Sequence, residues 1–331
     1  WMTLTSFSAF APQFAWPEWN RVMKTLLMVL ITLAALKDEK DIKAYAWVVG
    51  LSLGFYGLKG GLFTLTSGGS YLVMGPDHTY ISDNNDLALA LLATVPLIWY
   101  LALQATNRWL KRALIGLALM TLVSVVGSYS RGALLGGAAM LVFLWLKSSH
   151  KLRTGLLFAL FLPILIGSMP EEWFGRMGTI EDYQTDSSAM GRINSWYFAV
   201  NVAAENVMGG GFRTFTPSAF LIYAPNPSDV HAPHSIYFQV LGEHGFIGLG
   251  IFLLMLFFSW RSATRVIKFT KASEDLKWAT DLARMCQVSL AGFLVGGSFL
   301  SLAYFDLLYN VIILIVLLDK FLLPRSSSTG K

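Results

Sequence analysis

Residues 113–147 read ALIGLALMTLVSVVGSYSRGALLGGAAMLVFLWLK, and this stretch decides the class of the fold. Two uncharged apolar runs stand on either side of a short connection, residues 128–132, that contains Arg131. A helix needs roughly 17–25 apolar residues to cross a bilayer. The stretch therefore predicts two membrane-spanning helices joined by a turn that is too short to form a domain.

Similar apolar runs recur along the whole chain. Hydrophobic residues make up 55% of it and charged residues only 14%, whereas a soluble domain usually has about 25% charged residues. We therefore expect an all-α polytopic membrane protein. The nine predicted spans are 22–36, 41–58, 86–104, 110–127, 131–147, 152–168, 236–260, 284–303 and 306–323. The shorter ones need tilt or local thinning of the bilayer.

The predicted organisation is a single membrane domain over residues 1–331. Transmembrane segments occupy 86–168 and 236–323, and one long external loop, 169–235, lies between them. The chain starts at Trp1 without a Met, so further spans can precede it.

The basic residues are sorted by side. Of the 25 Lys and Arg, 18 follow the first, third, fifth, seventh or ninth span, all on one side of an alternating model. By the positive-inside rule this side is cytoplasmic. The formal charge of +5 is then mostly an insertion signal, and nucleic-acid binding is not expected because no recognition motif accompanies it.

Seven basic residues do not follow this rule: Arg21, Lys24, Lys59, Arg131, Arg176, Arg192 and Arg213. An arginine near membrane depth, such as Arg131, is costly unless it is paired or contacts a ligand. With Arg192, Arg213 and Lys59 it forms a cationic set that suits a pyrophosphate. The alternatives are a snorkelling Arg131, solvated surface arginines, and a simple interfacial turn at residues 59–61.

The long external loop, 169–235, contains further candidates. Its residues 191–206 predict an amphipathic helix that lies on the membrane, ended by the glycines 209–211. His234, at the start of a span, is a candidate general base, or else a capping or interfacial histidine. With His231 it could also bind zinc, but zinc normally needs at least three protein ligands.

Two other polar residues, Asp306 and Asn85, each have two possible roles. Asp306, between the last two spans, either forms a structural ion pair or orients the base. Asn85 either contacts sugar hydroxyls or caps a helix. The chain has no D-x-D pattern, which argues against a nucleotide-sugar glycosyltransferase, and its one cysteine, Cys286, excludes an internal disulfide.

Several short motifs on the predicted external side resemble the O-antigen ligase superfamily, which contains O-antigen ligases, O-antigen polymerases and protein O-oligosaccharyltransferases. They are Ser130-Arg131-Gly132, Gly191-Arg192, Trp196, Gly209-Gly210-Gly211, His234-Ser235, Tyr237 and Glu243-His244-Gly245. The order of the motifs along the chain is part of the resemblance. Residues 59–61, 75–77 and 83–85 resemble the branch of O-glycosylation ligases associated with exosortase systems.

The resemblance implies an enzyme of the bacterial inner membrane whose active site faces the periplasm. Such an enzyme transfers a glycan from undecaprenyl pyrophosphate to an acceptor hydroxyl, which is lipid A-core in lipopolysaccharide ligases, with inversion and without metal or other cofactor. Its partners are the lipid-linked donor, the acceptor and membrane lipids. The implied roles are general base for His234, pyrophosphate binding for Arg131, Arg192, Arg213 and Lys59, and substrate contact or orientation for Asp306, His231, Tyr237 and Asn85.

Two alternatives stay within the superfamily, namely an O-antigen polymerase and a protein O-oligosaccharyltransferase, because the donor chemistry is shared. A flippase or exporter of lipid-linked glycan is an alternative of another class. It predicts charged residues inside several spans, whereas here they gather at the outer ends of the spans.

Overall fold

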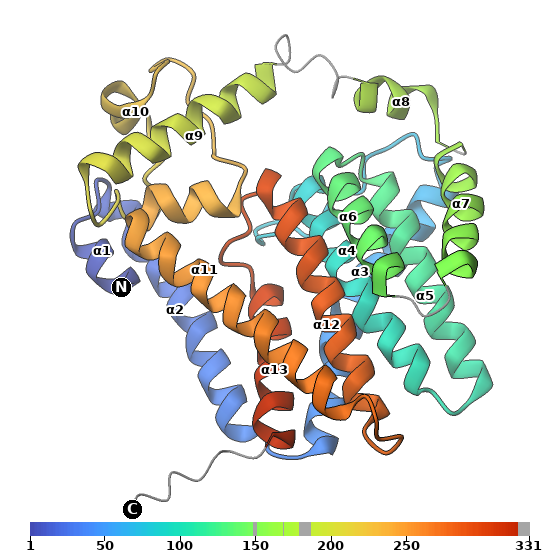
Figure 1. The fold of residues 1–331 in the computed structure, drawn as a ribbon. Coiled ribbons are helices and arrows are strands. Elements are labelled where there is room, and N and C mark those ends of the chain that lie inside the picture. The colour runs from blue at the N-terminus through green and yellow to red at the C-terminus, as the bar shows by residue number, and fades with distance from the viewer. Residues whose placement is uncertain (148–150, 168, 179–186, 324–331) are drawn as a thin grey trace, which may run out of the picture.

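The computed structural model describes residues 1–147, 151–167, 169–178 and 187–323, and every regular element in these ranges is a helix (Figure 1). The α-helices are α1 (Met2–Phe7), α2 (Pro12–Ala35), α3 (Glu39–Thr66), α4 (Asn84–Gln104), α5 (Arg108–Gly127), α6 (Arg131–Lys147), α7 (Lys151–Gly167), α8 (Glu171–Gly178), α9 (Ser187–Glu205), α10 (Pro217–Tyr223), α11 (Ile236–Thr270), α12 (Lys277–Gly296) and α13 (Asp306–Leu322). A short 3-10 helix, η1 (Gly297–Phe299), extends α12. The prediction of an all-α protein is confirmed for these residues.

Each of the nine predicted spans falls on one of the helices α2–α7 and α11–α13. Within the described part of the chain, five helices are long and apolar enough to cross a membrane: α3, α4, α5, α11, and α12 together with η1. Helix α6 is apolar but shorter. The chain is thus a multi-pass membrane protein, and the count of nine spans stays a prediction.

Helix α4 forms the centre of its half of the bundle. Almost every side chain between Leu87 and Ala102 is buried, and α4 packs against α3, α5, α6 and α12. A helix that is apolar on all sides is stabilised by burial on all sides. The uncharged run 87–103 therefore determines the central position of α4.

Glycines allow α3 and α5 to pack closely. A Cβ on Gly61 would collide with the backbone carbonyl of Met120, and one on Gly60 would collide with Ser124. Small residues serve this purpose at helix interfaces in membranes. The interfacial turn suggested for residues 59–61 is therefore wrong, because α3 continues to Thr66. Gly60 and Gly61 serve instead to pack α3 against α5.

Helix α11 bends at Gly245, whose φ of 67° and ψ of −173° are not helical. Figure 1 shows its first turns running across the direction of the remainder. The predicted span 236–260 therefore lies within α11, but the helix is bent at Gly245. The bend separates residues 236–244 from a longer segment that ends at Thr270.

The helix predicted within residues 191–206 is confirmed as α9. Its Phe198 is buried and stacks on Phe220 of α10, with ring centroids 4.3 Å apart. Tyr197 and Val200, apolar residues of this helix, are 58% and 38% exposed. That this face lies on the membrane stays a prediction.

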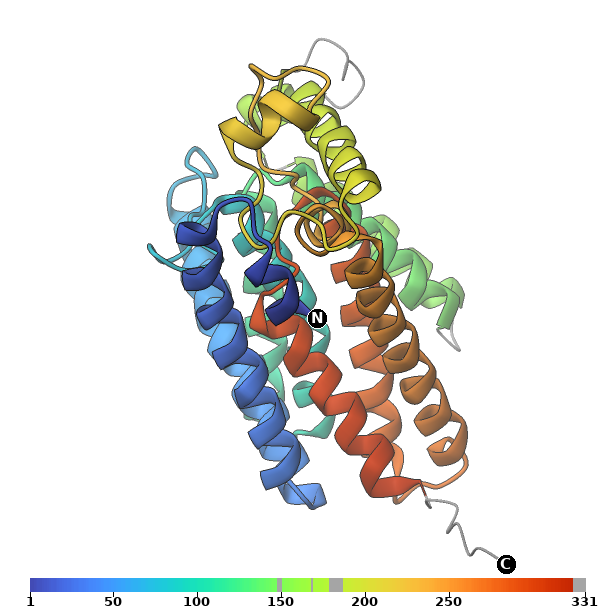
Figure 2. The same ribbon diagram turned by 90° about the vertical axis from the view of Figure 1, so that its left-hand side faces the viewer.

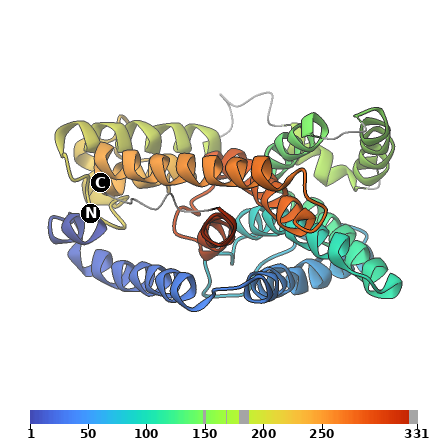
Figure 3. The same cartoon turned by 60° about the horizontal axis from the view of Figure 1, so that its bottom comes forward.

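The arrangement of the helix ends matches the sorting of charge. Helices α9 and α10 stand at one end of the bundle (Figure 2), and the connections 105–107 and 271–276 lie at the other (Figure 1). Helix α13 lies between the α2–α3 pair and the α11–α12 pair (Figure 3), and it packs against all four. The residues predicted to be external can therefore approach one another at the end that carries α9.

Candidate active site

Residues 194–196 of α9 hold the chain segment that leads into α11. Their side-chain donors bind the backbone carbonyls of Asn226, His231 and Pro233 at 2.8, 2.8 and 2.7 Å. A hydrogen bond of this kind contributes about 1 kcal/mol. Three consecutive side chains of one helix therefore fix the path of residues 226–233.

His234 lies at the sharp turn between this segment and α11. Its φ is +41°, a left-handed conformation that costs a non-glycine residue about 1 kcal/mol or more. Ser235 is extended, and Ile236 begins α11. The Trp196 ring stacks on Phe238 at 5.0 Å, with the ring planes 10° apart. The contacts of Trp196 with Pro233 and Phe238 thus fix the backbone before and after His234.

The surroundings of His234 lower its pKa to about 4. Burial is the largest cause, and the guanidinium of Arg192 lowers the pKa further, as His231 also does. The carboxylate of Asp83 acts in the opposite direction. The imidazole is therefore unprotonated at neutral pH, with a cation beside it, and it can accept a proton.

Asp83 connects this histidine to the start of α4. Its carboxylate accepts hydrogen bonds from the backbone N–H and the side-chain amide of Asn85, at 2.8 and 2.9 Å, and so caps the helix. The amide of Asn84 donates to the backbone carbonyl of Ser128 at 2.6 Å. The residue that caps α4 is therefore Asp83 and not Asn85, and a contact of Asn85 with sugar hydroxyls stays a prediction. The start of α4 meets the turn that leads to Arg131.

Arg131, the first residue of α6, is half-buried. Gly132 packs so closely on η1 that a Cβ there would lie 3.3 Å from a side chain of η1. A Cβ on the first residue of η1 would lie 2.9 Å from the side chain of Ile236. The short helix η1 therefore lies between the chain at Arg131 and the chain at His234, and the start of α4 lies near both.

Arg213 belongs to a different cluster. Its Nε lies 3.2 Å from Oε2 of Glu18, and its side chain is 63% exposed. The Tyr80 hydroxyl donates to Oε1 of Glu18 at 2.6 Å, and the Arg21 guanidinium stacks 3.5 Å above the Tyr80 ring. These contacts tie Arg213 to α2 and not to His234.

Three other predicted residues also lie elsewhere. Asp306 is exposed at the first turn of α13 and lines a separate cavity. Lys59 is exposed on α3. The Tyr237 hydroxyl donates to the backbone carbonyl of Leu294 at 3.1 Å, which joins α11 to α12. Neither Asp306 nor Lys59 contributes to the electrostatic interactions resolved at His234.

His231 is engaged by its own loop. Its Nδ1 lies 2.8 Å from Oδ1 of Asp229, and Gly191 packs against its ring. Among the residues that the structure describes, no three His, Cys, Asp or Glu side chains are placed to hold a metal ion together. The zinc alternative therefore has no ligand set in this part of the chain.

The motif Glu243-His244-Gly245 forms the joint at the bend of α11. Glu243 accepts hydrogen bonds from the backbone N–H of Arg213 at 2.9 Å and from the hydroxyl of Tyr304 at 2.6 Å. His244 Nδ1 lies 2.8 Å from the hydroxyl of Thr5. Both side chains are buried. The motif therefore has a structural role that its resemblance alone did not indicate.

Sequence reasoning missed Asp83 as a partner of His234. Asp83 and His234 are 151 residues apart in the sequence, and no periodic signal connects positions at that separation. The available signal was Asp83-Asn84-Asn85 before an apolar run, which is typical of a helix cap. This signal predicts that Asp83 caps a helix, but it does not predict that His234 lies near Asp83.

The comparisons with known proteins divide the chain into two parts. Residues 116–253 match the family model described as O-antigen ligase. Residues 1–106 match a model described as a family of unknown function. No curated protein and no solved structure matches the chain. Arg131, Arg192 and His234 all lie within residues 116–253.

Proposed function

We propose, since the chain belongs to the O-antigen ligase superfamily, that it transfers a glycan from undecaprenyl pyrophosphate to a hydroxyl group of an acceptor such as lipid A-core. The family and the apolar helices establish the broad class, an enzyme of lipid-linked glycans in a multi-pass membrane protein. The donor, the acceptor, the inner-membrane location and the periplasmic orientation are part of the proposal.

The observation that carries the proposal is the setting of His234. His234 is held at a strained turn, and burial and the charge of Arg192 lower its pKa to about 4, so that its imidazole is unprotonated at neutral pH. A base next to a fixed cation suits a reaction in which a hydroxyl loses a proton while an anionic group leaves. The turn that bears Arg131 meets the start of α4, where Asp83 lies near His234.

The proposed step is a single displacement. The acceptor oxygen attacks the anomeric carbon of the donor, and the bond from that carbon to the pyrophosphate oxygen breaks with its electron pair. The acceptor proton passes to His234, and undecaprenyl pyrophosphate leaves with one additional negative charge. Arg192 and Arg131 stabilise that charge, and the configuration at the anomeric carbon is inverted.

Donor binding strengthens the base in this scheme. The guanidinium of Arg192 is one of the causes of the low pKa of His234. A pyrophosphate on Arg192 offsets its positive charge and adds negative charge, which raises the pKa of a nearby histidine. His234 therefore becomes a better base once the donor is in place.

The chemistry at the donor does not distinguish a ligase from a polymerase or a protein O-oligosaccharyltransferase. All three break the same bond and differ in the molecule that supplies the hydroxyl. We propose the ligase with lipid A-core, with the other two as outcomes of the test. A flippase breaks no bond and needs no base, so the setting of His234 does not favour it.

In vitro transfer tests the proposal. Purified protein in nanodiscs receives glycan-linked undecaprenyl pyrophosphate with rough lipopolysaccharide, with a pilin-like protein, or with no acceptor, and mass spectrometry detects the product. We expect product with rough lipopolysaccharide and a loss of about 100-fold or more in Arg192→Gln or Arg131→Gln. Lys24→Gln, which removes an exposed charge on α2, controls for net charge and should remain active. Product without acceptor would indicate a polymerase, and no product in any mixture would contradict the proposal.

A further inference from the structure

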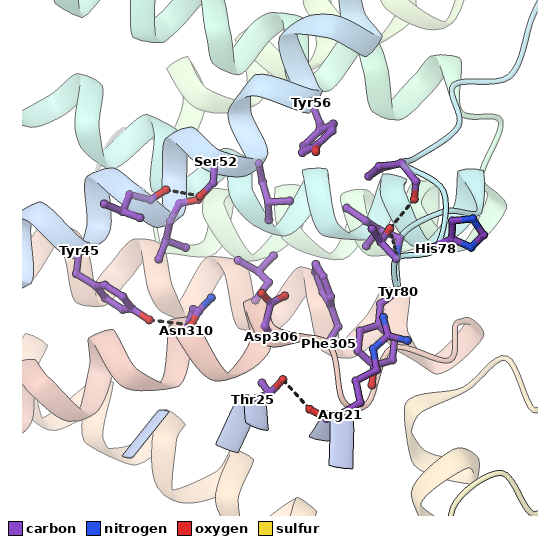
Figure 4. A pocket seen from close by; sticks show the side chains of 17 residues that line it. Arg21, Thr25, Tyr45, Ser52, Tyr56, His78, Tyr80, Phe305, Asp306 and Asn310 are labelled. Atoms are coloured by element: carbon purple, nitrogen blue, oxygen red, sulfur yellow. Dashed lines mark hydrogen bonds between the residues drawn. The ribbon is translucent and has the colours of Figure 1, made fainter. Parts of the chain in front are cut away.

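A cavity of about 490 Å³ lies between α2, α3 and α13 (Figure 4), away from His234. Its walls come from α2, from the middle of α3, from residues 76–81 and from residues 305–310. None of the described residues of 116–253, the part that matches O-antigen ligase, lines it. Apart from residues 305–310, the cavity is built by the segment that matches the family of unknown function.

The cavity reaches an exposed face of α3. Val48 and Ser52 line it, and both lie exposed on α3, a helix that can span a bilayer. Helices α2 and α3 both pack on α13, whose residues Asp306, Leu307 and Asn310 also line the cavity. A molecule that moves within the bilayer can therefore enter the cavity from the side.

The polar groups of the cavity carry opposite charges. Arg21 lies over the Tyr80 ring, and Asp306 of α13 stands near the centre of the cavity (Figure 4). Deeper in the cavity, the Tyr45 hydroxyl donates to the side-chain oxygen of Asn310 at 2.7 Å. A phosphate on Arg21 would be repelled by the carboxylate of Asp306, which disfavours a simple anion site.

Sugar hydroxyls fit this set better than a phosphate does. Each hydroxyl both donates and accepts hydrogen bonds, a carboxylate accepts, a guanidinium donates and an amide does both. Apolar walls with a few polar groups are typical of a site that binds a small molecule in one orientation. The apolar part here includes Val49, Leu53 and Phe305.

We infer that this cavity binds the sugar headgroup of a membrane glycolipid, the acceptor of the reaction proposed above. The acceptor role rests on that proposed function, whereas the binding itself does not. Residues 76–83 connect the two sites: Tyr80 lines the cavity, and Asp83 lies near His234. On this inference, the segment of unknown function recognises the acceptor and residues 116–253 act on the donor.

Photo-crosslinking tests the binding without any turnover. The protein is placed in phosphatidylcholine nanodiscs with a trace of one photoactivatable lipid: a diglycosyl diacylglycerol, a phosphatidylcholine or undecaprenyl pyrophosphate. Mass spectrometry then locates the modified peptides. We expect the glycolipid to label residues 45–56 and 305–310 at least about fivefold more than the phosphatidylcholine does, which corresponds to about one net hydrogen bond.

Two substitutions should abolish this preference. Val48→Trp fills the opening, and Asp306→Ala removes the central carboxylate. Phe55→Trp is the matched control, because Phe55 is 63% exposed on α3, as Val48 is at 64%, but does not line the cavity. Circular dichroism and thermal unfolding check that each variant is folded.

Equal labelling by the glycolipid and the phosphatidylcholine would overturn the inference, since it would indicate ordinary boundary lipid. Preferential labelling by undecaprenyl pyrophosphate would also overturn it, because the cavity would then hold the donor chain. A specific glycolipid signal in a protein that shows no transfer would keep the binding site and contradict the proposed function instead.

Discussion

Arg192→Gln and Asp83→Asn should shift the pKa of His234 in opposite directions. In the native protein this pKa is lowered to about 4, with burial as the largest cause, Arg192 lowering it and Asp83 raising it. Removing the guanidinium should therefore raise the pKa, and removing the carboxylate should lower it. Arg192→Gln leaves a shorter, neutral polar side chain. Asp83→Asn keeps the size of the side chain, and asparagine retains the ability to cap α4.

The size of each shift follows from Coulomb's law. If each charge lies about 7 Å from the imidazole at an effective dielectric constant of about 40, the interaction is about 1.2 kcal/mol, which is just under one pKa unit. At pH 4 about half of the native His234 is then protonated. The fraction should rise to about nine-tenths in Arg192→Gln and fall to about one-tenth in Asp83→Asn. Burial keeps the pKa in Arg192→Gln below 6.5, the usual value for histidine.

Nuclear magnetic resonance of protein labelled with 13C in histidine measures these fractions directly. The chain has five histidines, and the signal of His234 is the one lost in His234→Gln. Arg213→Gln serves as the control, because Arg213 pairs with Glu18 and should leave the titration unchanged. A native His234 that titrates near 6.5, or an Arg192→Gln variant without an upward shift, would refute the proposed electrostatics.

Three further predictions concern packing, positioning and metal. Gly61→Ala should lower the free energy of unfolding by about 1–3 kcal/mol, because the added Cβ would meet the Met120 carbonyl. Gly116→Ala is the control and should leave the stability unchanged, because no atom lies within 4 Å of a Cβ there. The melting temperatures of the two variants test this prediction. Trp196→Phe should lose the hydrogen bond to Pro233 but keep an aromatic ring, lowering the transfer rate about fivefold in a protein that circular dichroism shows to be folded. Transfer should continue in EDTA, and loss of activity that Mg²⁺, Mn²⁺ or Zn²⁺ restores would contradict the arginine mechanism.

Much of the helical arrangement could be predicted from local signals. Apolar runs locate the helices because a span has to be uncharged over its length, as residues 87–103 are in α4. Asp83 before such a run predicts a cap, and the glycines 209–211 mark the turns after α9. These features depend on residues that are close in the sequence.

The remaining features depend on residues that are far apart. The bend at Gly245 escapes prediction because the apolar pattern continues on both sides of it, and the buried hydrogen bond from Tyr304 to Glu243 joins positions about sixty residues apart. In the sequence, Arg213 and Arg192 look equivalent as external arginines. Among the ion pairs that the structure describes, Glu18 near the start of the chain pairs with Arg213. The cavity beside Arg21 needs residues from both ends of the chain, so no local pattern predicts it.

The central claim is that His234 takes the proton of the acceptor hydroxyl. The most direct test compares single-turnover transfer of a glycan from undecaprenyl pyrophosphate to rough lipopolysaccharide in His234→Gln and in His231→Gln. Because His231 is engaged by Asp229, we expect its substitution to leave most of the activity, whereas His234→Gln should lose about 100-fold or more. An active His234→Gln protein, or a larger loss in His231→Gln, would contradict this assignment.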